Sequence, residues 1–145
     1  LQVMTKLLLT NVLANVQRIE IETGGKKTVL GINRKDSSGA KDNSDYLVNG
    51  QKVNTDYFKD YYEVLFRVSL DSVNKVAPSG PSLFQATYFL NDGTSKTMAF
   101  FKTDTLKCGA VVDGKLEFDV KSSVVDHLIA QLENLIQNKP VNKVR

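Results

Sequence analysis

The sequence predicts an α+β protein built from two tandem β-β-β-β-α repeats, with one antiparallel sheet packed on two helices. Three observations lead to this prediction. Apolar and polar residues alternate in short stretches bounded by glycine and asparagine, which is typical of strands and tight turns. Two later stretches place apolar residues at helical spacing. The pattern "VNGQKV" (48–53) also returns as "VDGKLEF" (112–118), each time ahead of a helical stretch.

The first repeat opens with a predicted hairpin. Alternation from Val16 to Glu22 predicts a strand with one buried face, Gly24-Gly25 supplies a tight turn, and Thr28–Ile32 returns as the partner strand. One face of the first strand is expected to hold Val16, Arg18, Glu20 and Glu22, and the other Gln17, Ile19 and Ile21. The polar stretch from Lys35 to Asp45 has no apolar anchor, so we expect a surface loop there.

A second hairpin and a helix complete the first repeat. Asn49-Gly50 between apolar flanks predicts a two-residue turn. Asn54 or Thr55 can then cap a helix. Its apolar stripe is expected to contain Phe58, Tyr61, Tyr62, Leu65 and Val68. The stretch from Asn74 to Ser82 holds two prolines and a glycine, which predicts the boundary between the repeats.

The second repeat follows the same order. Strands are expected at Phe84–Leu90 and Lys96–Lys102, joined by a turn at Asn91-Asp92-Gly93, and a further hairpin surrounds Asp113-Gly114. Ser122 or Ser123 is the expected helix cap, and Asn138 and Pro140 end the helix. The expected apolar stripe contains Val125, Leu128, Ile129, Leu132, Leu135 and Ile136.

The predicted boundaries are 1–77 for the first repeat, with its helix near 55–69, and 78–145 for the second, with its helix near 122–137. Lys27-Thr28 is matched with Lys96-Thr97, and Val48-Asn49-Gly50 with Val112-Asp113-Gly114. One unit alone could hardly cover its own sheet face. The two repeats are therefore expected to share a core as one compact domain.

Composition excludes several classes of protein. The 145 residues are 41% hydrophobic and 24% charged, with a net charge of +3, which is typical of a globular domain and gives no basic stripe for nucleic acid. A single cysteine allows no internal disulfide, which fits the cytoplasm and the outer face of a bacterium equally well. The longest apolar run is too short to span a membrane. Because the chain opens at Leu1, we expect any anchor to lie upstream of it.

Three features could carry chemistry, and each has a simpler structural explanation. His127 is expected as an ordinary surface or boundary residue on the second helix, without a visible nucleophile, and Cys108 as a small buried residue. The stretch "TGGKKT" (23–28) lacks the first glycine of a phosphate-binding loop, so a hairpin turn is favoured. The acidic residues show no metal-binding spacing. We therefore expect no catalytic residue, cofactor site or metal site.

Aromatic residues are the best candidates for contact with a partner. Tyr57 and Phe66 fall at the margins of the first helical stripe, and Tyr46 precedes that helix, so these three are predicted partner contacts. A group of cations surrounds the first hairpin and the loop that follows it. For that group a solvated face is favoured over an anion-binding surface. Its members are Lys26, Lys27, Arg34, Lys35 and Lys41.

The stretches "NVQRIEIE", "YLVNGQKVNTDYFKDYYEVLFRVSLDSV" and "CGAVVDGKLEFDVKSSVVDHLIAQLENL" resemble a large family of uncharacterised bacterial repeat domains. Members of that family typically have an N-terminal membrane anchor and an extracytoplasmic body. They are often encoded with ABC transporters of the gliding-motility-auxiliary type. The resemblance covers about residues 15–137 and has no catalytic signature. It implies an accessory or scaffolding role at the cell envelope, with a membrane anchor outside this chain.

Two functions from different classes follow. The first is a non-enzymatic extracytoplasmic module that binds a protein partner through its sheet face or the Tyr46–Phe66 region, as an accessory to an ABC transporter system. It predicts an exposed apolar or aromatic patch larger than a few hundred Å². The alternative is a secreted inhibitor or small-ligand-binding protein with a concave sheet face and a deep apolar pocket. An enzyme would need His127, Cys108 and an aspartate to converge.

Overall fold

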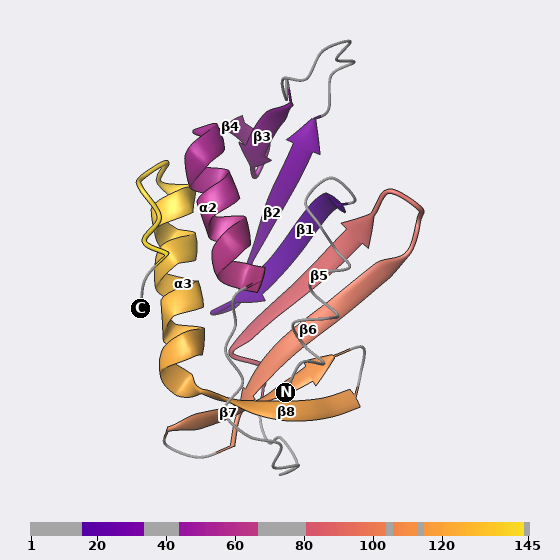
Figure 1. The fold of residues 1–145 in the computed structure, drawn as a ribbon, viewed down its shortest axis with the longest axis vertical. Helices are drawn as coiled ribbons and strands as arrows, with labels where there is room; N and C mark the ends of the chain where they lie inside the picture. Colours follow the sequence, from indigo (N-terminus) through magenta and orange to yellow (C-terminus); the bar gives the residue numbers. More distant parts are fainter. Residues whose placement is uncertain (1–15, 34–43, 67–80, 104–105, 113–114, 144–145) are drawn as a thin grey trace.

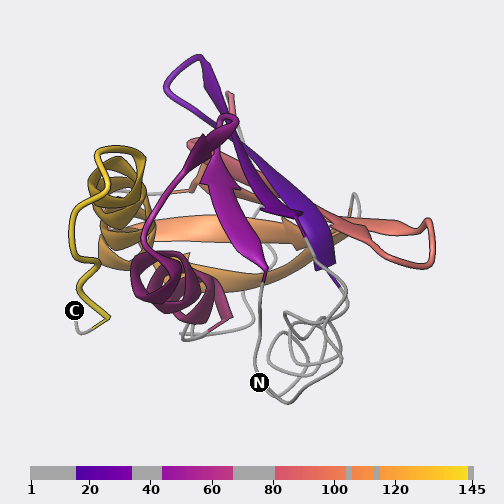
Figure 2. The same ribbon diagram turned by 90° about the horizontal axis from the view of Figure 1, so that it is seen from above.

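The computed structural model describes residues 16–33, 44–66, 81–103, 106–112 and 115–143. Within these ranges it leaves the side chains of residues 66, 112 and 115–119 undescribed. The fold is α+β, as predicted: an eight-stranded antiparallel sheet with two helices (Figure 1). Figure 2 shows the two helices side by side along one side of the sheet.

Among the described elements, four strands precede each of the two helices. The first set is β1 (Val16–Thr23), β2 (Lys26–Asn33), β3 (Asp45–Val48) and β4 (Gln51–Lys52), followed by α2 (Thr55–Phe66). The second set is β5 (Phe84–Leu90), β6 (Ser95–Lys102), β7 (Lys107–Val112) and β8 (Lys115–Lys121), followed by α3 (Ser122–Ile136). The predicted loop 35–45 lies mostly outside the described residues, and its last residue, Asp45, already belongs to β3.

The two sets of strands meet at the centre of the sheet. The strand order is β4-β3-β2-β1-β5-β6-β7-β8, and β1 pairs antiparallel with β5. In this pairing Ile19 lies opposite Tyr88 and Ile21 lies opposite Ala86. Every other pairing in this order joins strands that follow one another in the sequence. The β1–β5 ladder therefore carries the long-range connection within the sheet.

The predicted turns in the first half are confirmed. Gly24 and Gly25 have φ angles of 59° and 76°, and Asn49 and Gly50 have φ angles of 51° and 83°. Positive φ at both central residues matches the twist of the flanking strands, and glycine and asparagine tolerate it best. In the second half, Gly93 has a φ angle of 88° in the turn between β5 and β6. Asp113-Gly114 lies outside the described residues, although Val112 pairs with Lys115 across it.

The first strand departs from simple alternation. Val16 is fully buried and Gln17 is exposed, so the prediction that Val16 shares a face with Arg18 is wrong. The register between β1 and β5 shifts between Val16 and Arg18. A bulge of this kind adds one residue to a strand and reverses which side its end presents. The bulge therefore places Val16 in the core, where strict alternation would have exposed it.

Helix α2 matches its prediction closely. Asn54 Oδ1 accepts hydrogen bonds from the backbone N–H groups of Asp56, at 2.9 Å, and Tyr57, at 3.3 Å, so Asn54 is the cap. The expected buried stripe is confirmed by Phe58, Tyr61, Tyr62 and Leu65. Val68, the last predicted member of the stripe, lies outside the described residues.

Helix α3 confirms most of its stripe, because Val125, Leu128, Leu132 and Leu135 are buried. Ile136 is 37% exposed, contrary to prediction. The buried side of α3 also includes Val124 and Gln131, so the stripe is centred away from Ile136.

The predicted serine cap of α3 is also wrong. No side chain caps this helix, and the N–H of Ser122 donates to the carbonyl of Leu106 at 2.9 Å. Strand β8 runs directly into the helix, so the backbone of a neighbouring loop takes the place of a cap. Asn138 ends the helix as predicted, with a φ angle of 56° and the Lys139 N–H bonded to the carbonyl of Asn134.

Buried side chains of the strands and of both helices belong to one apolar cluster. The Tyr46 and Phe58 rings lie 4.8 Å apart between centroids, which joins β3 to α2. The Tyr61 hydroxyl donates to the Leu128 carbonyl at 2.9 Å, which joins α2 to α3. Burial raises the pKa of the Tyr61 hydroxyl well above its ordinary value, and this keeps it a neutral donor at physiological pH.

The segment after α3 binds back across both helices. Val141 is buried in the core cluster, and the N–H of Asn142 donates to Gln131 Oε1 at 2.7 Å. Asn138 Oδ1 accepts the N–H of Asn54 at the start of α2, at 2.9 Å. Lys143 lies 3.1 Å from a Glu63 oxygen and 3.5 Å from an Asp60 oxygen on α2. These contacts tie the C-terminal segment to α2 as well as to α3.

One predicted correspondence between the halves is wrong by a residue. Thr28 is buried opposite Ile21, whereas Thr97 lies opposite Thr87 on the other face of the sheet. Strand residues alternate between faces, so residues on opposite faces cannot be equivalent. The predicted match between Val48 and Val112, in contrast, is compatible with the sheet register. These two residues pair with Leu30 and Met98, and both Leu30 and Met98 are buried.

Two substitutions on α3 test which side of the helix supports the core. Leu132→Ala should lower the free energy of unfolding by about 2–5 kcal/mol, because it leaves a cavity at a residue that is 2% exposed. Ile136→Ala, the matched control at the exposed position, should cost less than about 1 kcal/mol. Urea denaturation followed by circular dichroism measures both, and equal losses would contradict the assigned stripe.

Candidate interaction surface

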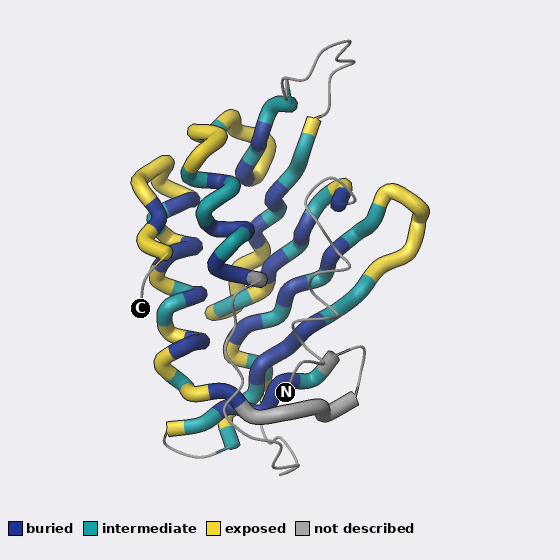
Figure 3. The backbone as a smooth tube through the Cα atoms, viewed as in Figure 1, coloured by how far each residue is buried: buried dark blue, intermediate teal, exposed yellow. Residues whose placement is uncertain are grey.

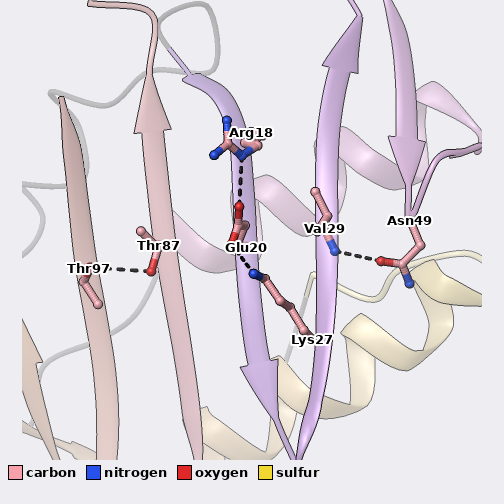
Figure 4. A network of polar contacts seen from close by, with 7 residues as sticks. All are labelled: Arg18, Glu20, Lys27, Val29, Asn49, Thr87 and Thr97. Carbon is pink, nitrogen blue, oxygen red and sulfur yellow. Dashed lines mark hydrogen bonds and ion pairs between the residues drawn. The ribbon is translucent and has the colours of Figure 1, made fainter. Parts of the chain in front are cut away.

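The strand side chains that alternate with the buried ones form a second sheet face, called here the outer sheet face. Most of its described side chains are partly exposed, in contrast to the buried residues between them (Figure 3). Figure 4 looks onto this face, and both helices lie behind the strands. Its residues include Arg18, Glu20, Glu22, Lys27, Val29, Gly31, Asp45, Leu47, Lys52, Gln85, Thr87, Phe89, Ser95, Thr97, Ala99, Phe101, Gly109 and Val111.

A carboxylate held by two cations lies near the centre of the outer sheet face. One Glu20 oxygen lies 3.0 Å from Arg18 Nε and the other lies 2.7 Å from Lys27 Nζ (Figure 4). The hydrogen bond from Lys27, followed by the one from Arg18, lowers the pKa of Glu20 below its ordinary value of 4.5. The same contact raises the pKa of Lys27. Glu20 and Lys27 are therefore both charged across the physiological pH range.

Arg18 also contacts an aromatic ring on the neighbouring strand. Its guanidinium carbon lies 3.9 Å from the centroid of the Phe89 ring, well within the range of a cation–π contact. The pairing of β1 with β5 places these two residues opposite each other. Arg18 is thus held from two directions, by the Glu20 carboxylate and by the Phe89 ring.

Polar contacts elsewhere on this face are weaker or lie at its margins. Thr87 and Thr97 face each other with hydroxyl oxygens 3.5 Å apart, at the limit of a hydrogen bond. Asn49 continues the ladder past the end of β3, because its Oδ1 accepts the N–H of Val29 at 2.8 Å and its own N–H donates to the Val29 carbonyl (Figure 4). At the β4 edge, Lys52 pairs with Asp45 at 3.2 Å.

Apolar side chains lie on both sides of this polar centre. Val29 and Leu47 flank it on β2 and β3, and Phe101 and Val111 lie beyond it on β6 and β7, all partly exposed. The large apolar residues that are more fully exposed lie elsewhere, before β5, before β7 and at the end of α3. Among the described residues these are Leu83, Leu106 and Ile136. The outer sheet face therefore has a mixed composition with a charged centre.

The predicted contact residues do not form one surface. Tyr46 is 3% exposed and its ring packs against Phe58, so its placement at a partner surface is wrong. It lies on the buried side of β3 because it pairs with Ile32 in register with Leu30 and Val48. Tyr57 is partly buried against the core cluster. The Phe66 side chain lies outside the described residues.

Sequence reasoning missed the Arg18–Phe89 contact. The signal for Arg18 was present, because it alternates with buried isoleucines and must therefore face away from the core. Phe89 alternates with buried Tyr88 and Ala86 in the same way. Only the β1–β5 register, which no local pattern specifies, brings the two together.

The two residues considered above for catalysis, Cys108 and His127, both lie partly or fully buried in the fold. Cys108 is fully buried, as predicted. His127 is partly buried on α3, which fits the expected boundary position. Within the described parts of the chain, histidine, cysteine, aspartate and glutamate side chains form no group of three or more that could hold a metal ion.

The stretch "TGGKKT" forms the β1–β2 turn, as predicted, and a hollow of about 340 Å³ lies beside it. Thr23 Oγ1 donates to the Leu83 carbonyl at 2.7 Å and so anchors the turn to the segment before β5. The lining consists of charged residues, hydroxyl-bearing residues and glycines: Glu22, Thr23, Gly24, Gly25, Lys26, Lys27 and Ser82. Such a lining lacks the apolar walls that usually enclose a small ligand.

Comparisons with known proteins identify no relative: no protein-family model matches the chain, and no significant match was found among curated proteins or solved structures. Neither of the described helices is long and apolar enough to cross a membrane.

Lys27→Met should raise the pKa of Glu20, because it removes the stronger of its two hydrogen-bonding cations. In the wild type, the folded-state pKa of Glu20 lies below the unfolded value. The stabilisation from its ionised form is therefore present above pH 4.5 and is lost as the pH falls through the folded value. In Glu20→Gln, the free energy of unfolding should accordingly fall less steeply as the pH is lowered below 4.5. An NMR titration of the Glu20 carboxyl measures the shift, and an unchanged midpoint in Lys27→Met would refute the contact.

Proposed function

We propose that the protein is a non-enzymatic interaction module that binds a protein partner through the outer sheet face. The observation that carries this proposal is the partly exposed Arg18–Phe89 contact on the two central strands, with partly exposed apolar side chains on the same face. Arginine and aromatic residues are enriched among the residues that dominate the energy of protein interfaces. The combination of an arginine and an aromatic ring on one exposed face therefore favours a binding surface.

The geometry favours the outer sheet face over the Tyr46–Phe66 region, the other surface considered for this role. Tyr46 is buried, and Tyr57 packs against the core. The outer sheet face, in contrast, spans β1 to β7, and the described helices lie on the opposite side (Figure 4). A broad, mixed surface of this kind suits a protein partner, because protein interfaces combine apolar and polar contacts over a wide area.

We also propose that the chain is a tandem duplication of one β-β-β-β-α unit, packed into a single domain. The strand order supports this, since it runs β1 to β4 in one direction from the centre and β5 to β8 in the other. Matching registers add support: Val48 pairs with Gln51 across a two-residue turn, and Val112 pairs with Lys115 in the same way. In this account each helix covers the buried face of its own four strands, and the outer face extends over both units.

The cellular setting belongs to the same proposal. The resemblance to anchored bacterial repeat domains supports an extracytoplasmic location, with the anchor outside this chain. On that view the module is an accessory of an ABC transporter system at the cell envelope. A sheet that offers one face to a partner while its other face is buried suits a scaffold that holds envelope components together.

The alternative, an inhibitor or small-ligand-binding protein, receives less support. The hollow beside the β1–β2 turn has the volume of a small ligand site, about 340 Å³. Its lining of glycine, lysine and glutamate is open and polar, which favours solvent over a bound apolar molecule.

Affinity capture from a native membrane extract tests the proposed surface with a matched pair of variants. Thr87→Arg places a large charged side chain at the centre of the outer sheet face, and Ala130→Arg places the same side chain on the exposed side of α3. We expect the wild type and Ala130→Arg to capture the same envelope protein and Thr87→Arg to lose it. Circular dichroism must show that both variants fold. Capture that survives Thr87→Arg, or no envelope partner for the wild type, would contradict the proposal.

A further inference from the structure

We infer that Arg18 is the anchor of the outer sheet face and that it receives a carboxylate from an acidic segment of the protein partner. This inference rests on the proposed function and gives its partner a chemistry.

The Arg18 side chain is held in place before any partner arrives. Its Nε donates to Glu20 at 3.0 Å, and its guanidinium carbon lies 3.9 Å from the Phe89 centroid. A free arginine side chain loses much of its rotamer entropy when it is ordered at an interface. The contacts with Glu20 and Phe89 already restrict the Arg18 side chain, so binding a partner costs less rotamer entropy.

The remaining donors of Arg18 suit a carboxylate. Among the described residues, the hydrogen bond from Arg18 uses Nε, which leaves the two terminal nitrogens for a partner. Figure 4 shows these nitrogens pointing away from Glu20. A guanidinium group presents paired N–H donors that match the two oxygens of a carboxylate, and such bidentate contacts are among the strongest hydrogen bonds in proteins.

Exposure on this face favours an acidic partner over a basic one. The Arg18 and Lys27 side chains are 40% and 54% exposed, whereas the Glu20 side chain between them is 20% exposed. The Lys52–Asp45 pair shows the same order, at 68% and 20%. In these three ion pairs the cation stands further out than its carboxylate. An approaching molecule therefore meets positive charge first, although Glu22 near the β1–β2 turn is also exposed.

The surroundings of Arg18 specify a protein segment and not a free anion. Phe89 lies beneath the guanidinium, and Leu47 lies in the same cross-strand row on the far side of Gly31. Both are partly exposed and apolar. A partner that places an apolar side chain beside its carboxylate would bury these two while the carboxylate pairs with Arg18. Contacts of this kind exclude water from the ion pair, which strengthens it.

The test is a titration of the full chain with an amidated six-residue peptide in which two glutamates flank a leucine. Binding is monitored by NMR at 150 mM salt. We expect a saturable shift of the Arg18 side-chain Nε–H resonance and of the backbone amides around Leu47 and Phe89. Arg18→Ala should weaken binding about tenfold or more, as expected for loss of a charge-assisted hydrogen bond. Arg18→Lys should not restore it, because lysine lacks the paired donors.

Lys59→Ala is the matched control, because Lys59 on α2 also lies near an aromatic ring, 5.6 Å from the Tyr46 centroid, but belongs to another surface. This variant should bind the peptide like the wild type. Equal binding of a peptide with lysines in place of the glutamates would overturn the inference. So would tighter binding to anionic vesicles or to a single-stranded oligonucleotide, no saturable shift, or wild-type affinity in Arg18→Ala.

The capture experiment separates this inference from the proposed function. If Thr87→Arg loses the envelope partner and Arg18→Ala keeps it, the outer sheet face is the interface and the arginine anchor is wrong. If both variants keep the partner, both proposals fail. Loss of the partner in both variants, with capture retained by Lys59→Ala, supports the two together.

Discussion

The antiparallel pairing of β1 with β5 is the constraint on which the rest of the structure depends. Other neighbouring strands in the sheet are also neighbours in the chain, so each of those pairings closes only a local loop. The β1–β5 ladder joins the two four-stranded halves and brings their buried faces into one apolar cluster. It also sets Arg18 opposite Phe89 on the other side of the sheet. The core and the candidate interaction surface therefore arise from the same register.

Local patterns predict much of this fold, because the physics behind them is local. Asn49-Gly50 forms a turn with positive φ, and Asn54 caps α2, since both features depend on residues within a few positions of each other. The helical stripes of Phe58–Leu65 and Val125–Leu135 follow from the same reasoning. The pairs Val48–Gln51 and Val112–Lys115 each join two strands that follow one another in the chain.

The features that the sequence could not predict depend on distant contacts. The bulge near Val16 appears only when β5 sets the register of β1, and the missing side-chain cap of α3 reflects a hydrogen bond to Leu106. Tyr46 was expected at the surface, but its pairing with Ile32 on β2 turns its side chain towards the core. The candidate site was missed for the same reason. Arg18, Lys27 and Phe89 are ordinary strand residues until the sheet places them side by side.

Native-state hydrogen exchange of the β1 and β5 amides tests the central role of this ladder most directly. The account predicts that amides bonded between the Ile19–Ile21 and Ala86–Tyr88 segments exchange only through global unfolding, with one shared free energy and one denaturant dependence. Core amides of α2 and α3 should share that value. A contradictory result would be a β1–β2 hairpin that opens at a much lower free energy while β5 and β6 stay protected, because the two halves would then be separate units.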